Sequence, residues 1–313
     1  PGQEAGVLGL KSIEASITRF PDEEHGDVIR LDMSNIQEPW NIGQHYYLCF
    51  PQGSVWQSHP FTPLNAPEIV KGTVRHSYIL RAKKGETRKI ADLASKGTLT
   101  TSVILTGAYG ESITKDITQS TNIICVAGGT GITYVLPVLL QLAQQPSSAD
   151  RKIDLVWAIR HTSNVQWIRQ ELDILRQARK AMNLKIRIFA TRDTSSSTTS
   201  KESILPAKNV EEKSMQASEQ ASSAADVCDC DFDVPVKLGG SGSADSRHPD
   251  LRRLITEFLG NTVTGPTTVF ASGPGGMLSD LRNIVAACNS ASKVWNGQER
   301  FDVNLVYDDR LEW

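Results

Sequence analysis

The spacing of apolar residues divides the chain into two regions with different periodicity. Before residue 110, apolar side chains recur at about every second position, and β-branched and aromatic residues are enriched, which predicts short strands. The segments with this pattern are LKSIEASITRF (10–20), DVIRLDM (27–33), HYYLCF (45–50), HSYILRA (76–82) and SVILTG (102–107). Turn residues such as Lys84-Gly85 separate them. The pattern predicts a small antiparallel β-barrel, with one short helix near 89–95.

From residue 122 onward, strand and helix patterns alternate. The strands are expected near 122–127, 153–159, 185–190, 266–271 and 301–306, and the helices near 132–145, 164–180, 249–259 and 275–290. This alternation is typical of a doubly wound parallel sheet, which binds ligands at the carboxyl ends of its strands. The predicted fold is therefore an antiparallel β-barrel domain over residues 1–116, followed by an α/β doubly wound parallel-sheet domain over residues 117–313.

Residues 194–247 interrupt the second domain. The segment is rich in Ser, Ala and Glu, has little apolar periodicity and is far longer than an ordinary loop, so we expect most of it to be disordered. It is either a regulatory tether or a tolerated insertion, and its composition favours the insertion.

Composition narrows the class of function. A chain of 313 residues, 39% apolar and 22% charged, with a net charge of -2, has no bulk attraction for nucleic acid or anionic lipid, so we expect small-molecule chemistry and no nucleic-acid partner. Five scattered cysteines indicate a reducing compartment and no disulfide framework. The longest apolar region, 123–143, is broken by glycine and polar residues and is a poor membrane span. The start at Pro1 suggests a cut N-terminus.

The segment NIICVAGGTGIT (122–133) is a strand pattern that runs through a glycine turn into a helix pattern. Glycine permits positive φ and close approach of a ligand, and the free N–H groups of a helix start favour a phosphate. The turn therefore suits a dinucleotide pyrophosphate, although a turn that only tightens a strand–helix corner explains it equally well. The candidate residues are Gly128, Gly129, Thr130, Gly131, Ile132 and Thr133.

Three further segments carry candidate chemistry. In His59-Pro60-Phe61-Thr62-Pro63, a flat ring could pack on the proline and phenylalanine while the Thr62 hydroxyl bonds a ring nitrogen. The cations, Gly85 and Thr87 of RAKKGETRK (81–89) suit a second pyrophosphate. Alone, the first segment is better explained as a stiffened strand end, and the second is equally well explained as a solvated basic loop. SGPGGM (272–277) is another strand, glycine turn and helix, so two such turns could flank one nicotinamide.

Taken together and in this order, these motifs resemble the cytosolic dehydrogenase module of fungal ferric-chelate reductases and NADPH oxidases, within the ferredoxin-NADP reductase superfamily. The resemblance covers nearly the whole chain outside 194–247. The matching segments are HPFTP, GETRK, GAYG (107–110), GGTGIT, VWAIR (156–160) followed by Trp167 and Glu171-Leu172, SGPGGM and the C-terminal aromatic residue.

The resemblance implies roles for the matched positions. The isoalloxazine and ribityl of FAD would be held by His59, Pro60, Phe61 and Thr62, and its pyrophosphate by Arg81, Gly85 and Thr87. The glycine turn at 128–133 would bind the nicotinamide dinucleotide, and the nicotinamide would be bordered by Ser272, Gly273, Pro274 and Met277. Arg160 stands where the family contacts the adenosine 2'-phosphate, a group suited to a guanidinium. Arg192 could assist, although an ordinary surface arginine is as consistent with its position.

Trp313 aligns with the terminal aromatic residue that covers the flavin in this superfamily, so its motion would gate hydride transfer. The residues expected nearest the reaction are thus Thr62, Ser272 and Trp313. Two positions depart from the family pattern. His248 stands at the family's arginine position, with Arg247 one place earlier, which weakens the case for NADPH over NADH, and Ser272 replaces the family's cysteine.

By resemblance, the chain is an FAD-dependent NAD(P)H oxidoreductase module with FAD and NADPH as cofactors and no metal of its own. Electrons would pass to haem in a transmembrane domain N-terminal to Pro1, from the cytosolic face of a membrane, expected to be the plasma membrane, and finally to ferric iron, a ferric chelate or copper. One alternative is an NADPH oxidase domain that makes superoxide. Another is a non-catalytic flavin-fold interaction module, which the intact motifs disfavour.

Overall fold

The computed structural model describes residues 11–52, 57–146, 151–193, 248–262 and 264–308, together with the backbone of residues 227–228 and 236–238. Within these residues no helix is both long enough and apolar enough to cross a membrane. The boundary expected at residues 116 and 117 falls between the last strand of the first sheet and the first strand of the second, and it stays a prediction.

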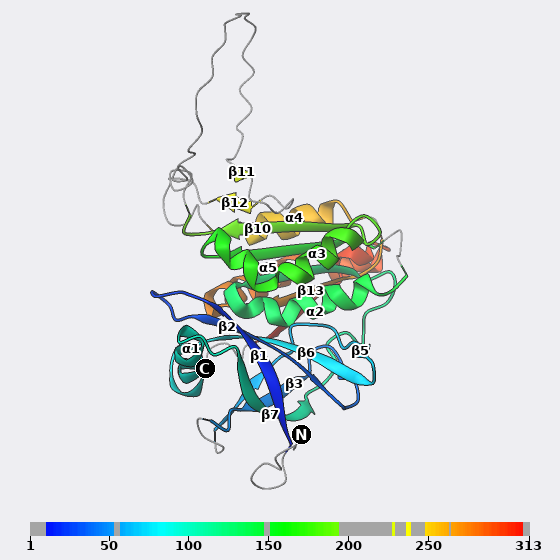
Figure 1. Ribbon diagram of the computed structural model, residues 1–313. Coiled ribbons are helices and arrows are strands. Elements are labelled where there is room, and N and C mark those ends of the chain that lie inside the picture. The colour runs from blue at the N-terminus through cyan, green and yellow to red at the C-terminus, as the bar shows by residue number, and fades with distance from the viewer. Residues whose placement is uncertain are drawn as a thin grey trace, which may run out of the picture.

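The N-terminal half is one antiparallel sheet that curls around its own core (Figure 1). Its strands are β1 (Ser12–Phe20), β2 (Val28–Asn35), β3 (His45–Cys49), β4 (Ser58–Phe61), β5 (Ile69–Val70), β6 (Thr73–Arg81) and β7 (Thr100–Tyr109), in the order β4-β3-β7-β1-β2-β6-β5. One helix, α1 (Gly85–Ser95), packs against β1 and β2. The predicted antiparallel barrel is confirmed in the form of a half-barrel whose edge strands are β4 and β5.

Two details of this half differ from the sequence prediction. None of the predicted strands includes His59-Pro60-Phe61, but this segment lies inside β4 and pairs with β3. Proline is tolerated there because β4 is an edge strand and needs no N–H on its outer side. Helix α1 begins at Gly85, four residues earlier than expected, because Gly85 takes a φ of +60° and turns the chain into the helix.

The C-terminal half is a parallel sheet with helices on both faces, as predicted. Its main strands are β8 (Asn122–Gly128), β9 (Ile153–Ile159), β10 (Leu184–Ala190), β13 (Thr267–Ser272) and β14 (Val303–Asp308), in the order β10-β9-β8-β13-β14. The helices are α2 (Ile132–Ala143), α3 (Arg169–Ala178), α4 (Leu251–Gly260), α5 (Gly275–Cys288) and α6 (Ala291–Trp295), with 3-10 helices η2 (Gly129–Gly131), η3 (Thr162–Ile168) and η6 (Glu299–Phe301).

The long inserted segment contributes to this sheet. Strand β12 (Val236–Leu238) pairs in parallel with β10, and β11 (Val227–Cys228) pairs with β12. Neither strand was predicted, because the composition of 194–247 gave no strand signal. The rest of that segment lies outside the described residues, so its expected disorder stays a prediction.

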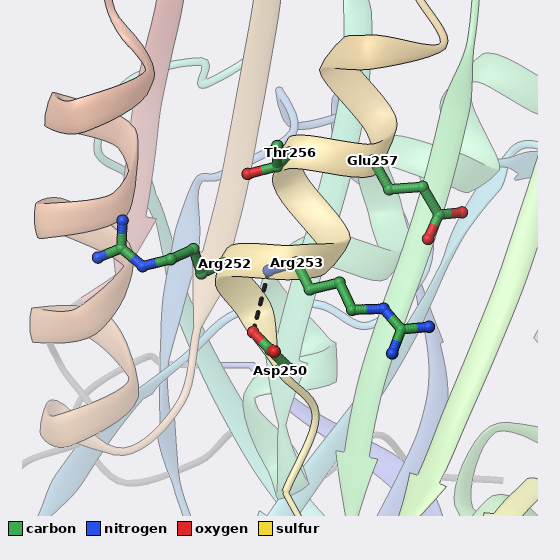
Figure 2. Close-up of a pocket in the computed structure, with 5 residues that line it drawn as sticks. All are labelled: Asp250, Arg252, Arg253, Thr256 and Glu257. Atoms are coloured by element: carbon green, nitrogen blue, oxygen red, sulfur yellow. Dashed lines mark hydrogen bonds between the residues drawn. The ribbon is translucent and has the colours of Figure 1, made fainter.

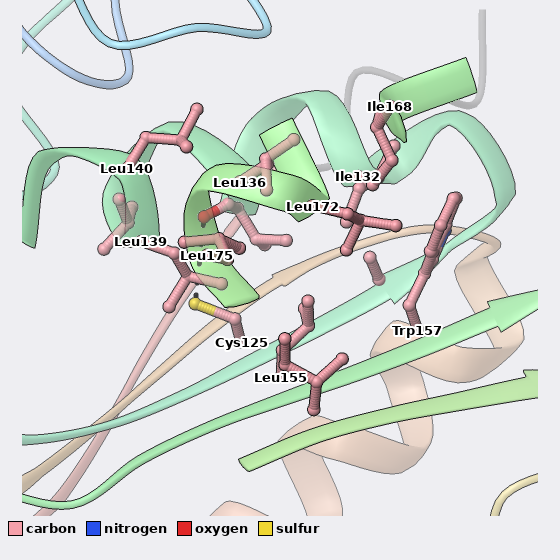
Figure 3. Packing of buried hydrophobic residues seen from close by; sticks show 14 of the residues in the cluster. Cys125, Ile132, Leu136, Leu139, Leu140, Leu155, Trp157, Ile168, Leu172 and Leu175 are labelled. Atoms are coloured by element: carbon pink, nitrogen blue, oxygen red, sulfur yellow. Dashed lines mark hydrogen bonds between the residues drawn. The ribbon is translucent and has the colours of Figure 1, made fainter. Parts of the chain in front are cut away.

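Apolar side chains fill the space between the sheet and the helices on each face. Helices α2 and α3 cover one face and α4 and α5 the other (Figure 1). Figure 3 shows apolar side chains of α2 and α3, among them Leu139, Leu172 and Leu175, packed over Cys125, Leu155 and Trp157 on the strands. Helix α2 is apolar almost all round because both of its sides are buried, and Pro137 lies inside it as predicted.

His76 is an ionisable group inside the apolar core of the half-barrel. Its ring lies 4.5 Å from that of Trp40 and 5.1 Å from that of Tyr46, measured between centroids, and its Nδ1 atom shares a hydrogen bond of 2.9 Å with the Tyr78 hydroxyl. The Nε2 atom has no hydrogen-bond partner among the described residues. Burial lowers the pKa of His76 to about 4, so the core holds the neutral imidazole.

We predict that His76 makes the protein sensitive to acid. The unfolded chain takes up a proton near pH 6.5 that the folded core excludes, so stability falls as pH falls from 6.5 towards 4, by up to about 3 kcal/mol from this group. The variant His76→Phe cannot titrate, so its free energy of unfolding, measured by urea titration at a series of pH values, should fall less over this range than that of the wild type. Parallel pH curves for the two proteins would contradict the assignment.

Candidate functional site

The two glycine turns meet where the order of the parallel strands reverses. The chain moves outward from β8 through β9 to β10 and then returns to β13 on the other side of β8. Ligands of such sheets bind in the crevice at this switch point, beyond the carboxyl ends of the strands. Gly128 ends β8 and Ser272 ends β13, so the structure brings both predicted turns to the crevice.

The two turns also pack directly on each other. A Cβ atom on Gly131 would lie 2.2 Å from the carbonyl oxygen of Ser272, and one on Gly128 would lie 2.6 Å from Cδ of Pro274. A Cβ on Gly273 would lie 2.5 Å from the Met277 methyl group. Contact within the protein therefore requires glycine at positions 131 and 128, where the neighbouring atoms are backbone or a proline ring, while at Gly273 the flexible Met277 side chain could move. Tight packing of a strand–helix corner, without any ligand, thus accounts for part of the glycine pattern.

Gly129 is different, because nothing lies within 4 Å of the place where its Cβ would be. Its φ is +54°, and its carbonyl accepts a hydrogen bond of 3.0 Å from the buried indole N–H of Trp157. Thr130 and Thr133 beside it are half-buried, with the Thr133 hydroxyl donating to the Thr130 carbonyl, and Ile132 is fully buried. The open side of the turn thus lies at the start of α2, which no side chain caps.

Ser272 places an unpaired polar atom at the same point. The residue is 1% exposed, and its hydroxyl oxygen has no hydrogen-bond partner among the described residues. A buried hydroxyl without a partner is unfavourable by about 1–3 kcal/mol, so it favours a ligand that supplies one. The open turn at Gly129 and the unpaired Ser272 hydroxyl together fit a nicotinamide dinucleotide with polar groups at both ends.

Arg160 and Arg192 lie together just beyond β9 and β10. The backbone N–H of Arg192 donates to the carbonyl of Arg160 at 2.8 Å. Burial and the positive charges of Arg81 and Arg192 hold the pKa of Arg160 below its usual value, although Asp22 opposes them. Mutual repulsion of guanidinium groups is relieved by a bound anion, so this corner suits a phosphate.

A neighbouring contact, which the sequence did not reveal, fixes this corner. Asp193 accepts a hydrogen bond of 2.6 Å from the backbone N–H of Thr162 and pairs with His161 Nδ1 at 2.8 Å. Neither the position of Asp193 after a strand nor that of His161 before η3 indicated that the two meet. Trp157 was visible in the VWAIR motif, but its bond to Gly129 depends on the packing of α2.

In the half-barrel, the predicted flavin residues lie in the edge strand β4 and directly after it. The rings of His59 and Phe61 lie 6.5 Å apart on one face, and Phe61 packs against the core. Pro60 stands opposite Tyr47 on the other face, and Thr62 is half-buried just after the strand. The side chains are therefore divided between two faces, and their contact with a flavin stays a prediction.

The predicted pyrophosphate residues lie at the end of β6 and at the start of α1. Gly85 and Thr87 lie at the start of α1, whose N-cap makes no side-chain hydrogen bond, and the Thr87 hydroxyl donates to the Lys84 carbonyl. The Arg81 guanidinium instead donates to Asp22 at 2.7 Å and to the Gly26 carbonyl at 2.9 Å. These two acceptors already hold the Arg81 guanidinium. The role of Arg81 at a pyrophosphate stays a prediction.

The remaining candidates lie at or beyond the limits of the described residues. His248 is exposed shortly before α4, and Arg247 and Trp313 are outside the described residues. Figure 2 shows an open depression over the first turns of α4, lined by Asp250, Arg252, Arg253, Thr256 and Glu257. Asp250 accepts from the backbone N–H of Arg253 and so caps the helix. The depression mixes both signs of charge and includes none of the predicted site residues.

Across the described part of the chain, no three His, Cys, Asp or Glu side chains form a group that could hold a metal ion. The candidate site instead offers hydrogen-bond donors, namely hydroxyls, guanidinium groups and backbone N–H groups at a helix start, which suit phosphates and amides.

Comparison with known proteins matches both halves of the chain. Residues 120–286 match the family model of the ferric reductase NAD binding domain, and residues 9–113 match that of an FAD-binding domain. The chain belongs to the ferric reductase family. Its two domains are those of an FAD-dependent oxidoreductase, so FAD and a nicotinamide dinucleotide are its cofactors.

Relatives in the family are longer proteins. The ferric/cupric reductase transmembrane component 2 of Saccharomyces cerevisiae is 25% identical over 88% of this chain and 38% of its own length. A probable ferric reductase transmembrane component of Candida albicans is 32% identical over 48% of this chain and 21% of its own length. The chain thus spans less than two fifths of either relative.

Solved structures share the fold at low identity. The ferredoxin-NADP+ reductase of Plasmodium falciparum is 13% identical and superposes with a TM-score of 0.57 over 95% of this chain and 97% of its own. A ferredoxin NADP+ reductase of Neisseria gonorrhoeae, with bound FAD and NADP, gives 0.55 at 14% identity over 95% and 98% of the two chains. This agreement establishes the fold of the chain.

The contact between the two turns gives a prediction about stability. Gly131→Ala should be destabilising by about 1–3 kcal/mol, because the added methyl group collides with the Ser272 carbonyl, which is held in β13. Gly276→Ala in α5 is the matched control, since nothing lies within 4 Å of its Cβ position, and it should be neutral or stabilising by up to about 1 kcal/mol. Urea unfolding measures both. Equal effects of the two substitutions would show that the turns do not pack as described.

Proposed function

We propose that the chain is the dehydrogenase module of a membrane ferric reductase, which passes hydride from NADPH to FAD and then electrons toward haem. The observation that carries the proposal is the crevice at the switch point. There the glycine turn, open at Gly129, packs through Gly131 on the backbone of Ser272, whose buried hydroxyl has no partner among the described residues, in a chain whose halves match FAD-binding and ferric reductase NAD-binding domains.

The protein's own contribution is to bind, orient and exclude water. Bound FAD supplies the chemistry, since it accepts two electrons as hydride and releases them singly. The half-barrel would hold it through His59, Pro60, Phe61 and Thr62, with the Thr62 hydroxyl bonding the ring and Arg81, Gly85 and Thr87 near the pyrophosphate.

Binding of the nicotinamide dinucleotide would use the open turn of Gly129 and Thr130. Ser272, with Gly273, Pro274 and Met277, would border the nicotinamide and supply the hydroxyl that is unpaired in the free protein. Trp313 would cover the flavin ring and step aside when the nicotinamide arrives. No general base is needed, because the step transfers a hydride between rings.

The corner at Arg160 supports NADPH as the preferred donor. Two positively charged side chains, Arg160 and Arg192, suit the doubly charged 2'-phosphate that distinguishes NADPH from NADH. At the family's arginine position the chain has His248, with Arg247 one place earlier, so this pair would add less to the preference for NADPH than the family's arginine does.

The names of the relatives support part of the proposed location and acceptor, since they describe transmembrane ferric or cupric reductase components. By its resemblance to the family's cytosolic dehydrogenase modules, this module would lie on the cytosolic face of a membrane, the plasma membrane. An N-terminal transmembrane haem domain of the same full-length protein would take its electrons, and ferric iron or a ferric chelate would be the final acceptor. These names support metal reduction over superoxide production.

The first test is an anaerobic titration of the FAD-supplemented protein with NADPH and, separately, with NADH. We expect rapid loss of the oxidised-flavin absorbance, at lower concentrations of NADPH than of NADH. Bound FAD that neither nucleotide bleaches would overturn the proposal and favour a non-catalytic flavin-fold module.

The second test concerns the choice of nucleotide. Arg160→Leu should weaken NADPH binding by about 10- to 100-fold, because a charge-assisted contact to the 2'-phosphate is lost, while NADH binding changes little. The concentration dependence of flavin bleaching measures both affinities. Arg179→Leu, which removes an exposed arginine just after α3, is the control and should leave both unchanged. An equal loss for NADPH and NADH would refute the assignment of Arg160 to the phosphate.

A further inference from the structure

Arg30 crosses from the half-barrel into the parallel-sheet domain. Along β2, Ile29 and Leu31 point into the core of the half-barrel, while Val28 packs with the cluster around α2. Arg30 therefore lies on the outer face of β2, toward the second domain, and it is only 5% exposed.

The Arg30 guanidinium is fully engaged by groups from both domains. Its Nη1 and Nη2 atoms donate to the two carboxylate oxygens of Glu171 in α3 at 2.8 and 2.7 Å. Its Nη1 atom also donates to the carbonyl of Trp167 in η3 at 3.1 Å, and its Nε atom donates to Asp32 beside it in β2 at 3.0 Å. Glu171 is 5% exposed, so this two-pronged ion pair is closed off from water.

A second arginine of the half-barrel contacts η3. The Arg81 guanidinium lies 5.5 Å from the centre of the Trp167 ring. The Trp167 ring in turn lies 6.3 Å from that of Trp157, whose indole N–H holds the Gly129 carbonyl. A continuous set of contacts therefore joins β2 and β6 of the half-barrel to the open glycine turn.

Apolar side chains also meet across the domain interface. Val28, Leu64 and Ile79 of the half-barrel belong to the same buried cluster as α2. Apolar contact holds two surfaces together but is not directional, so it leaves their relative rotation weakly fixed. A buried bidentate ion pair has one favoured geometry, and its rupture leaves a charge without a partner.

We propose that Arg30 and Glu171 are positioning residues for hydride transfer: their ion pair fixes the flavin-holding half-barrel at the distance and angle from the glycine turn that the reaction needs. The inference rests on the proposed function. Hydride transfer requires the reacting atoms to lie about 3–3.5 Å apart, and a misplacement of about 1 Å slows such a step by about 100-fold. The Trp167 and Glu171 positions of the family motif thereby gain a physical role.

The variants that test this proposal are Arg30→Met, Glu171→Gln and their combination. Arg187→Met is the matched control. Arg187 is also an arginine in an ion-pair network, with a side chain only 10% exposed, 3.3 Å from Asp154 and 3.0 Å from Glu257, but all three residues belong to one domain. It should therefore destabilise the protein without changing how the two domains lie.

The first readout is anaerobic stopped-flow reduction of the FAD-supplemented protein by NADPH. Arg30→Met and Glu171→Gln should each lower the limiting rate of flavin bleaching at saturating NADPH by about 10- to 100-fold, with FAD content and NADPH affinity changed by less than about threefold. The double variant should be no slower than the slower single variant, since one geometry is already lost. Arg187→Met should lower the melting temperature and keep the wild-type limiting rate.

The second readout measures domain orientation without any reaction. Spin labels are placed on Leu99→Cys and Trp295→Cys, which are 73% and 91% exposed in the wild type and lie in different domains, with Cys228, Cys230 and Cys288 replaced by Ser. Double electron–electron resonance should give one narrow distance distribution for the parent and for Arg187→Met, and a broader one for Arg30→Met and Glu171→Gln.

The outcomes separate this inference from the proposed function. A folded, FAD-loaded Arg30→Met protein with the full limiting rate and an unchanged distance distribution overturns the inference, as does equal slowing by Arg187→Met. A parent protein that binds FAD but is not bleached by NADPH overturns the proposed function. The distance distributions then still decide whether the ion pair orients the domains.

Discussion

The close approach of two backbones at the switch point governs the rest of the site. The Ser272 carbonyl lies where a side chain on Gly131 would begin, so β13 and the start of α2 are in contact at the main chain. This contact fixes the positions of Gly128 and Gly273 as well, and it leaves Gly129 as the residue with its open side free. The rigid part of the turn thus presents one short, accessible stretch of backbone to a ligand.

The same region ties local geometry to the arrangement of the domains. Trp157 fills the space under α2 and bonds the Gly129 carbonyl, and Trp167 lies between it and Arg81 of the half-barrel. The glycine turn is therefore held by Trp157 of the core, and Trp157 is in turn packed on Trp167, which contacts the half-barrel. A ligand that spans both domains depends on this support, since neither half alone fixes the distance between its ends.

Periodicity was sufficient to predict the fold class and most elements, because strands and helices that bury one face carry a regular apolar pattern. It missed β4 and β5, which are short edge strands with a proline or with exposed side chains and so have little pattern to detect. It also missed β12, whose three residues form a strand only because β10 offers a free edge. Such strands are determined by their neighbours.

The site was predictable to the extent that its chemistry depends on local sequence. Both glycine turns and the strand ends that hold Arg160 and Ser272 follow from strand–turn–helix patterns. Contacts between distant segments were not predictable, such as Arg30 with Glu171, 141 positions apart, or Arg81 with Asp22. The sequence placed Arg81 among cations suited to a phosphate, whereas the fold surrounds its guanidinium with acceptors from the β1–β2 connection.

Serine at position 272, where the resemblance leads one to expect cysteine, changes the energetics of the crevice. A thiol is a weak hydrogen-bonding group that tolerates burial, whereas a buried hydroxyl without a partner is unfavourable in the free protein. In the proposed function, a ligand with an amide or carbonyl group would supply the missing hydrogen bond and would gain more binding free energy from it than from a thiol, which is a weaker hydrogen-bonding group. In the proposed reaction this gain applies to the bound nicotinamide as much as to the transition state. Serine should therefore favour binding of the nucleotide more than the speed of hydride transfer.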